Sequence, residues 1–191
     1  MCIRDSIYFS NISKVNTIEL LKGSINSKFN ESSPALTRDG KMMYFVRCGE
    51  EDRELSNCNI YFTRIDNGIW MEPEKMPFQK EGVNYYSPRI TDDGSRLYFA
   101  SDLSGGQGGL DIYYVSKSEK GWSDPVRLPN TVNTPGNENF LTLWKNEIYF
   151  SSDFLSGLGG YDIFSTGMDP ANNFTPPQNL KPPFNLSLIH I

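Results

Sequence analysis

Residues 87–99, Ser-Pro-Arg-Ile-Thr-Asp-Asp-Gly-Ser-Arg-Leu-Tyr-Phe, carry the landmarks that decide the fold of this chain. Their closing Tyr-Phe pair returns about every 50 residues, at Tyr44-Phe45, Tyr98-Phe99 and Tyr149-Phe150. A fixed period of about 40 to 50 residues is typical of propellers and solenoids. The chain is therefore built from repeats.

Other landmarks keep the same register as the Tyr-Phe pair. The first two units share Ser33-Pro34 with Ser87-Pro88, and Asp39-Gly40 with Asp93-Gly94. Each unit then has an Asp or Asn followed by Ile and an aromatic residue, and later one more aromatic: Asn59-Ile60-Tyr61 and Trp70, Asp111-Ile112-Tyr113 and Trp122, Asp162-Ile163-Phe164 and Phe174. Several independent landmarks in one register indicate a true repeat.

Short apolar runs separated by Gly, Pro, Asn and Asp predict four strands in each unit. In the clearest copy, Pro88 removes one ladder donor from the first strand, and Asp93-Gly94 supplies the positive φ angles of a tight hairpin turn. The strands of this copy are expected over 87–91, 96–100, 111–116 and 126–128. No stretch has a sustained helical period, so no helix longer than a turn or two is expected.

The predicted fold class is all-β, a β-propeller fragment of about three four-stranded antiparallel blades. The blades are expected over 29–80, 83–131 and 137–185, after the C-terminal half of a preceding blade over 7–28. One small sheet buries too little apolar surface to offset the loss of chain entropy, so each blade must stack on its neighbours. Phe45, Phe99 and Phe150 are accordingly predicted in the contacts between blades.

The two ends of the chain are interpreted as artefacts. Codons for residues 186–191 and, in reverse complement, for residues 1–6 match one DNA tag that resembles a transposase adaptor used in sequencing. Such ends are set aside before any argument about fold. The genuine sequence is then 7–185, an incomplete ring whose exposed strand edges and apolar blade faces are expected to cause association.

Composition narrows the classes of function. Without the two ends, which hold Cys2 and His190, the chain has no histidine, so residues 7–185 alone cannot supply a Ser-His-Asp triad or a His-ligated metal site. The net charge of −5 argues against a nucleic-acid partner, which needs a basic stripe. No apolar run reaches the roughly 18 residues of a membrane span.

The motif Ser-Pro-x-x-Thr-x-Asp-Gly-x-x-x-Tyr-Phe, a Gly-rich loop and then Asp-Ile-Tyr resembles the WD40-like repeat of TolB-type propellers. The long form, with Ser101-Asp102 before the loop, is most similar to propellers of OmpA-family, peptidoglycan-associated envelope proteins. The resemblance implies a scaffold in the periplasm or at the outer membrane, with peptidoglycan bound by a separate domain outside this sequence. The last unit departs from the motif, with Glu138-Asn139 in place of Ser-Pro and Lys145-Asn146 in place of Asp-Gly.

The Gly-rich loops 105–109 and 157–160, which end at Gly109 and Gly160, have two alternative interpretations. A phosphate cradle needs a helix directly after the loop, whereas a strand is predicted here, so glycines that let the loop lie flat are favoured. The carboxylates that bracket the loops, Asp102 with Asp111 and Asp153 with Asp162, could hold calcium. Local hydrogen bonds to loop amides are the favoured role, and no cofactor or metal is predicted.

Cys48 and Cys58 flank one hairpin. Cys48 stands where the other copies have Asp102 and Asp153, and Cys58 precedes Asn59 as Leu110 precedes Asp111. Facing ends of antiparallel strands bring Cα atoms to about 4.5–5.5 Å, within the range of a disulfide, so a cross-loop disulfide is predicted. Disulfides persist in oxidising compartments, which favours the periplasm or cell surface. Two buried free thiols are the alternative.

Two classes of function remain open. The first is a non-catalytic module that binds other envelope proteins, in keeping with the lack of histidine between residues 7 and 185. The second is a propeller accessory to a hydrolase such as a prolyl-oligopeptidase-like peptidase, which a Gly-x-Ser-x-Gly motif in the flanking sequence would indicate. No such motif occurs between residues 7 and 185.

Overall fold

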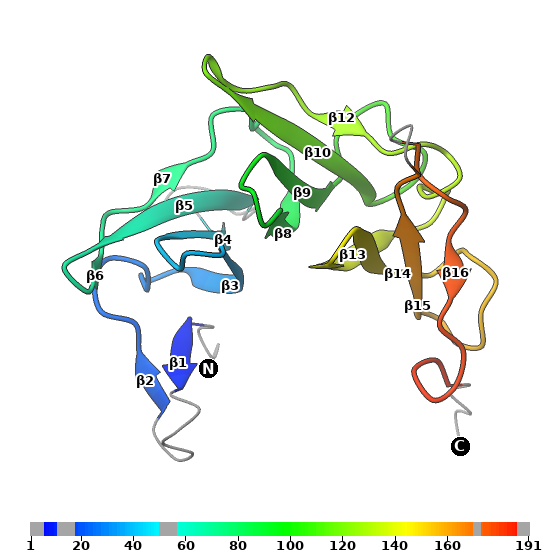
Figure 1. Cartoon of the computed structure of the whole chain (residues 1–191), viewed down its shortest axis with the longest axis horizontal. Coiled ribbons are helices and arrows are strands. Elements are labelled where there is room, and N and C mark those ends of the chain that lie inside the picture. The colour runs from blue at the N-terminus through cyan, green and yellow to red at the C-terminus, as the bar shows by residue number, and fades with distance from the viewer. Residues whose placement is uncertain (1–5, 11–17, 50–56, 170–172, 187–191) are drawn as a thin grey trace.

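The computed structural model describes residues 6–10, 18–49, 57–169 and 173–186. Within these ranges the chain is all-β, without a helix, and its antiparallel sheets follow one another along an arc (Figure 1). The described residues accordingly contain no helix that is long and apolar enough to cross a membrane.

The middle blade shows the plan of the repeat. Its strands run β8 (Tyr85–Ile90), β9 (Arg96–Ser101) and β10 (Asp111–Ser118), with β8 on the concave side of the arc (Figure 1). The outermost strand consists of two short pieces, β11 (Gly121–Trp122) and β12 (Val126–Arg127), both paired with β10. Pro125 lies between the two pieces and has no N–H for a ladder bond, which accounts for the break.

The other sheets repeat this plan. The blade before it contains β3 (Asn30–Leu36), β4 (Met42–Cys48), β5 (Cys58–Asp66), β6 (Ile69–Trp70) and β7 (Glu74–Lys75). The blade after it contains β13 (Glu138–Trp144), β14 (Glu147–Ser152), β15 (Asp162–Gly167) and β16 (Gln178–Asn179). At the N-terminal side, β1 (Tyr8–Ser10) pairs with β2 (Ile18–Leu20) in the register that β5 has with β7.

A β-bulge lies in the innermost strand of each blade. The register shifts between Tyr86 and Arg89, where Ser87 has a φ of 50° and Pro88 follows. Ser33-Pro34 forms the same bulge in β3, with a φ of 53° at Ser33. The prediction that Glu138-Asn139 replaces Ser-Pro in the last blade is wrong, because the bulge there is at Phe140-Leu141. The turn between β13 and β14 is shorter than the turn between β8 and β9. Counting back from Tyr149-Phe150 by the spacing of the middle blade therefore gives a position two residues before the bulge.

The Asp-Gly turns differ from the prediction in one respect. Only the glycines have positive φ angles, 67° at Gly40 and 69° at Gly94, and the aspartates do not share them. Each aspartate instead accepts hydrogen bonds within the turn, Asp39 from Thr37 Oγ1 and Lys41 N, and Asp93 from Thr91 Oγ1 and Ser95 N. The loop is therefore a longer turn closed by an aspartate side chain, as is usual for Asx turns.

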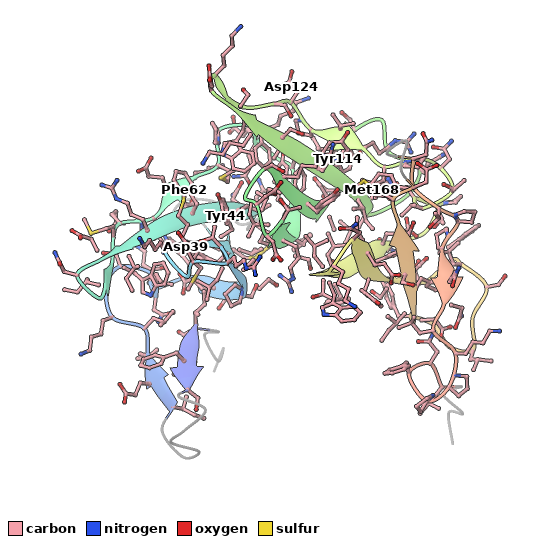
Figure 2. All side chains as sticks on the ribbon, viewed as in Figure 1. Asp39, Tyr44, Phe62, Tyr114, Asp124 and Met168 are labelled. Atoms are coloured by element: carbon pink, nitrogen blue, oxygen red, sulfur yellow. A yellow bond between two sulfur atoms is a disulfide. The ribbon has the colours of Figure 1, made fainter. Side chains whose placement is uncertain are left out.

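The hydrophobic core lies between blades. Tyr44 and Ile60 of the first full blade pack in one cluster with Leu97 and Phe99 of the next, and Phe62 lies beside Tyr44 with ring centroids 6.4 Å apart (Figure 2). Tyr98 and Ile112 pack in the same way with Ile148 and Phe150. Phe45, Phe99 and Phe150 are at most 1% exposed. Burial of these rings couples each blade to its neighbour.

The outer face of the last blade lacks this cover. Ile163 occupies the place of Ile60 and Ile112, which are fully buried, yet it is 39% exposed. Phe140 on the same blade is 69% exposed and meets Tyr161 edge-to-face. The association expected from such a face stays a prediction.

Candidate binding surface

The Gly-rich loops are closed by aspartate side chains. Asp111 Oδ2 accepts hydrogen bonds from Gln107 N at 2.7 Å and Gly108 N at 3.4 Å, and Asp162 Oδ2 accepts from Leu158 N at 2.6 Å. A Cβ at Gly106 would collide with Asp111 Oδ2, so glycine is needed for the loop to lie flat. Strands β10 and β15 begin at these aspartates, and the loops therefore lack the helix of a phosphate cradle.

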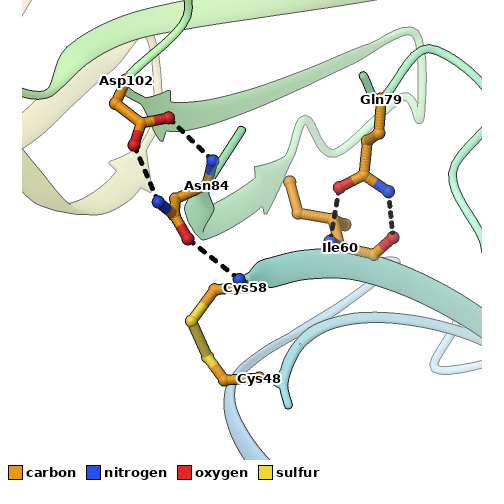
Figure 3. The surroundings of a disulfide bond; sticks show 6 residues. All are labelled: Cys48, Cys58, Ile60, Gln79, Asn84 and Asp102. Carbon is orange, nitrogen blue, oxygen red and sulfur yellow. Dashed lines mark hydrogen bonds between the residues drawn. A yellow bond between two sulfur atoms is a disulfide. The ribbon is translucent and has the colours of Figure 1, made fainter. Parts of the chain in front are cut away.

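The second pair of aspartates holds the junction between blades. Asp102 accepts two hydrogen bonds of 2.7 Å, from Asn84 N and Nδ2, and Asn84 Oδ1 in turn accepts from Cys58 N of the preceding blade (Figure 3). In the last blade, Asn137 N and Nδ2 donate to Asp153 in the same way, and Asn137 Oδ1 accepts from Leu110 N of the middle blade. Within the described residues no group of three or more His, Cys, Asp or Glu side chains is placed to hold a metal ion.

Cys48 and Cys58 form the predicted disulfide. They are directly opposite in the β4–β5 ladder, with Cα atoms 4.0 Å apart (Figure 3). Cys48 stands in the sequence where the next blade has Asp102, whose carboxylate binds Asn84, so at this position the first full blade has a covalent link to β5 in place of an aspartate.

Removing the disulfide should cost about 3 kcal/mol of folding free energy, because the cross-link closes a loop of about ten residues in the unfolded chain. The measurement is urea unfolding of the Cys48→Ser/Cys58→Ser variant against the parent. The parent under reducing conditions should behave like the variant. Equal midpoints for oxidised parent and variant would show that the link contributes nothing.

A repeated side-chain latch was missed in the sequence. Asn133 Oδ1 accepts from Ile112 N at 2.8 Å while its Nδ2 donates to Ile112 O at 3.0 Å, so one carboxamide completes the edge of β10 as a strand would. The same two bonds join the other latch pairs: Asn26 to Ile7, Gln79 to Ile60 (Figure 3) and Asn185 to Ile163. The sequence does contain a signal for the latch, because each latch asparagine follows a leucine by five residues: Leu21 and Asn26, Leu128 and Asn133, Leu180 and Asn185.

A cavity of about 650 Å³ opens at the turn ends of the inner strands. Three successive blades line it, and the bulges place Ala35, Arg89 and Thr142 at equivalent positions, each two residues after the residue of positive φ. Leu143, Ile148 and Met168 add apolar atoms. Figure 2 shows Met168, from the last blade, on the side that faces the middle blade, where its sulfur accepts from Arg96 Nη1 at 3.6 Å.

The cavity contains charges of both signs. Burial lowers the pKa of Arg89, which marks a guanidinium that has lost part of its hydration. Hydrogen bonds from Thr91 and Ser95 lower the pKa of Asp93 to about 2, so this carboxylate is ionised at neutral pH. Most of the residues that line the cavity are polar or charged, and its volume lies within the range usual for ligand sites.

No protein-family model and no curated protein matches the chain. Among solved structures, TolB from Acinetobacter baumannii is 20% identical with a TM-score of 0.59 over 93% of this chain and 38% of its own length. The putative TolB from Agrobacterium tumefaciens gives the same identity, TM-score and coverage of this chain, and 57% of its own length is covered. The tricorn protease is similar at 11% identity and a TM-score of 0.54, over 84% of this chain and 19% of its own. The chain thus spans between about two fifths and three fifths of the TolB chains, and it has the fold of a TolB-type β-propeller.

Proposed function

We propose that this chain is part of a non-catalytic propeller that binds other proteins in a bacterial cell envelope. The observation that carries the proposal is the 650 Å³ cavity, which three successive blades line with apolar atoms and charged side chains of both signs. The volume of the cavity lies within the range of clefts that bind ligands. Asp102 and Asp153 lie at the other end of the blades and accept hydrogen bonds from asparagines. These bonds favour a structural role for the two carboxylates over acid–base chemistry.

The envelope location is supported by two independent features. The Cys48–Cys58 disulfide suits an oxidising compartment such as the periplasm. The repeat motif resembles that of OmpA-family envelope proteins, and the fold is that of TolB-type propellers. Attachment to peptidoglycan would then be the task of a separate domain.

Photo-crosslinking from inside the cavity tests the proposal. A photoreactive phenylalanine replaces Leu36 or Lys145, which both line the cavity, in the chain exported to a bacterial periplasm. The matched control replaces Lys120, an exposed residue in the β10–β11 turn. We expect both cavity positions to give adducts with the same envelope protein, identified by mass spectrometry, and the control to give none.

Equal adducts from all three positions would contradict a binding role for the cavity. Capture of a hydrolase of the prolyl-oligopeptidase type would instead favour the accessory role, which also fits the fold shared with the tricorn protease.

A further inference from the structure

Arg89 has an unusual position among the inner-strand residues. Of the three equivalent positions that line the cavity, the middle one carries an arginine, and its neighbours are the small residues Ala35 and Thr142. Larger side chains at these flanking positions would fill the space around the guanidinium. The small side chains of Ala35 and Thr142 leave the positions on either side of Arg89 open, while Arg96 and Lys145 line the cavity from other strands and turns.

The guanidinium also lacks a counter-charge. Its Nη1 donates a hydrogen bond to Pro88 O at 2.7 Å, and among the described residues no carboxylate lies within ion-pair distance of it. The contrast is Arg47 of the preceding blade, whose Nε is 2.9 Å from Glu31 Oε1. A guanidinium has five N–H donors in a planar fork, so Arg89 retains donors that can reach a ligand in the cavity.

We propose that Arg89 is the recognition residue for a carboxylate on a peptide segment that enters this cavity. The inference deepens the proposed function and rests on it. A planar fork binds a carboxylate with two parallel hydrogen bonds, and the partly dehydrated site strengthens such a pair. Burial without a counter-ion, seen in the lowered pKa of Arg89, favours the same type of ligand.

The rest of the lining narrows the ligand further. Three carboxylates, from Asp92, Asp93 and Glu147, line the cavity together with three cations, from Arg89, Arg96 and Lys145. Because these charges balance, the site suits a carboxylate with one negative charge better than a phosphate, which carries close to two at neutral pH. Leu143 and Ile148 add apolar surface to the lining of the same cavity. The ligand is therefore a segment with one carboxylate next to an apolar side chain.

Binding of short peptides to the chain tests the inference. The probes are Ac-Ala-Leu-Asp-Leu-Ala-NH2, its Asn counterpart, its phosphoserine counterpart, and Ac-Ala-Leu-Leu-Ala with a free C-terminal carboxylate. Binding is followed by NMR on the arginine Nε–H signals. We expect the Asp peptide to bind at least about tenfold more tightly than the Asn peptide, since a charge-assisted pair contributes at least that factor. The free-acid peptide shows whether a terminal carboxylate serves as well.

Three variants separate recognition from folding. Arg89→Gln should remove the preference for Asp over Asn, and Arg64→Gln, at an exposed arginine on the preceding blade, should leave it unchanged. Thr142→Trp, at an exposed lining position, should block binding while Arg89 stays in place.

Equal affinities for the Asp and Asn peptides, or full preference in Arg89→Gln, would overturn the inference. Tighter binding of the phosphoserine peptide would overturn the choice of carboxylate. If cross-links form from Leu36 and Lys145 while no peptide prefers a carboxylate, the inference fails and the proposed function stands.

Discussion

Replacing Arg47 with Met is expected to lower the free energy of unfolding by about 3–5 kcal/mol, the cost of breaking a buried ion pair from one side. The Glu31 side chain is fully buried and that of Arg47 is 11% exposed, with Nε and Oε1 2.9 Å apart. Without Arg47, the Glu31 carboxylate keeps, among the residues that the structure describes, its contacts with Ser27 N and Oγ to offset a buried charge. Urea unfolding measures the loss.

Arg47 also ties the blade to the segment before it. Its Nη2 donates to Ile25 O at 2.8 Å, and its guanidinium lies over the rings of Phe45 and Tyr61, at 5.6 and 5.0 Å from the centroids. Arg64→Met, at an exposed position, serves as the control and should change stability by less than about 0.5 kcal/mol.

A second substitution, at Glu31, shows whether the loss of stability comes from the broken ion pair or from the lost packing of Arg47. The Glu31→Gln/Arg47→Met double variant should recover a large part of the stability, because it no longer buries a charge. If the double variant is as unstable as Arg47→Met, the loss comes from the contacts of Arg47 with Ile25, Phe45 and Tyr61.

Asn133→Ala is expected to cost about 4 kcal/mol, because two buried backbone groups lose their partners at about 1–3 kcal/mol each. The N–H of Ile112 loses Asn133 Oδ1, and the carbonyl of Leu128 loses Nδ2 at 3.1 Å. Ile112 O keeps one bond, from Leu128 N at 3.0 Å. The side chain is 1% exposed, so water cannot replace these bonds without local opening.

Hydrogen exchange tests the latch at the atom concerned. In the parent, the Ile112 amide should be among the protected amides of β10, and in Asn133→Ala it should exchange much faster. Asn130→Ala, an exposed asparagine in the same linker, is the matched control and should change neither stability nor exchange by much. Unchanged protection of Ile112 in Asn133→Ala would show that the latch adds nothing.

The fold could be predicted from the sequence because its signals are local and repeated. Short apolar runs such as Leu97 to Ala100 and turns such as Asp93-Gly94 act within a few residues, and the copies of the repeat reinforce one another. The Cys48–Cys58 pairing could be predicted for the same reason, since the two cysteines end strands of one hairpin.

The bulge of the last blade, the latch and the cavity could not be predicted, because they depend on contacts between residues that are distant in the sequence. The bulge at Phe140-Leu141 has none of the Ser-Pro chemistry of the other blades, and the sequence alone placed it two residues early. The latch joins Asn133 to Ile112, 21 residues apart, through the main chain. The cavity around Arg89 arises only when three inner strands meet.

The latch also bears on how this chain tolerates mutation. Each carboxamide binds the main-chain N–H and C=O of its isoleucine and makes no use of the side chain there. Substitutions at residue 112 can therefore change the packing between blades without disturbing the junction, whereas Asn133 has little room to vary. We therefore expect unequal rates of sequence change in homologues, with strand residues that vary and latch residues that stay Asn or Gln. A blade duplicated from elsewhere in the ring should fit as long as it contains its own latch carboxamide.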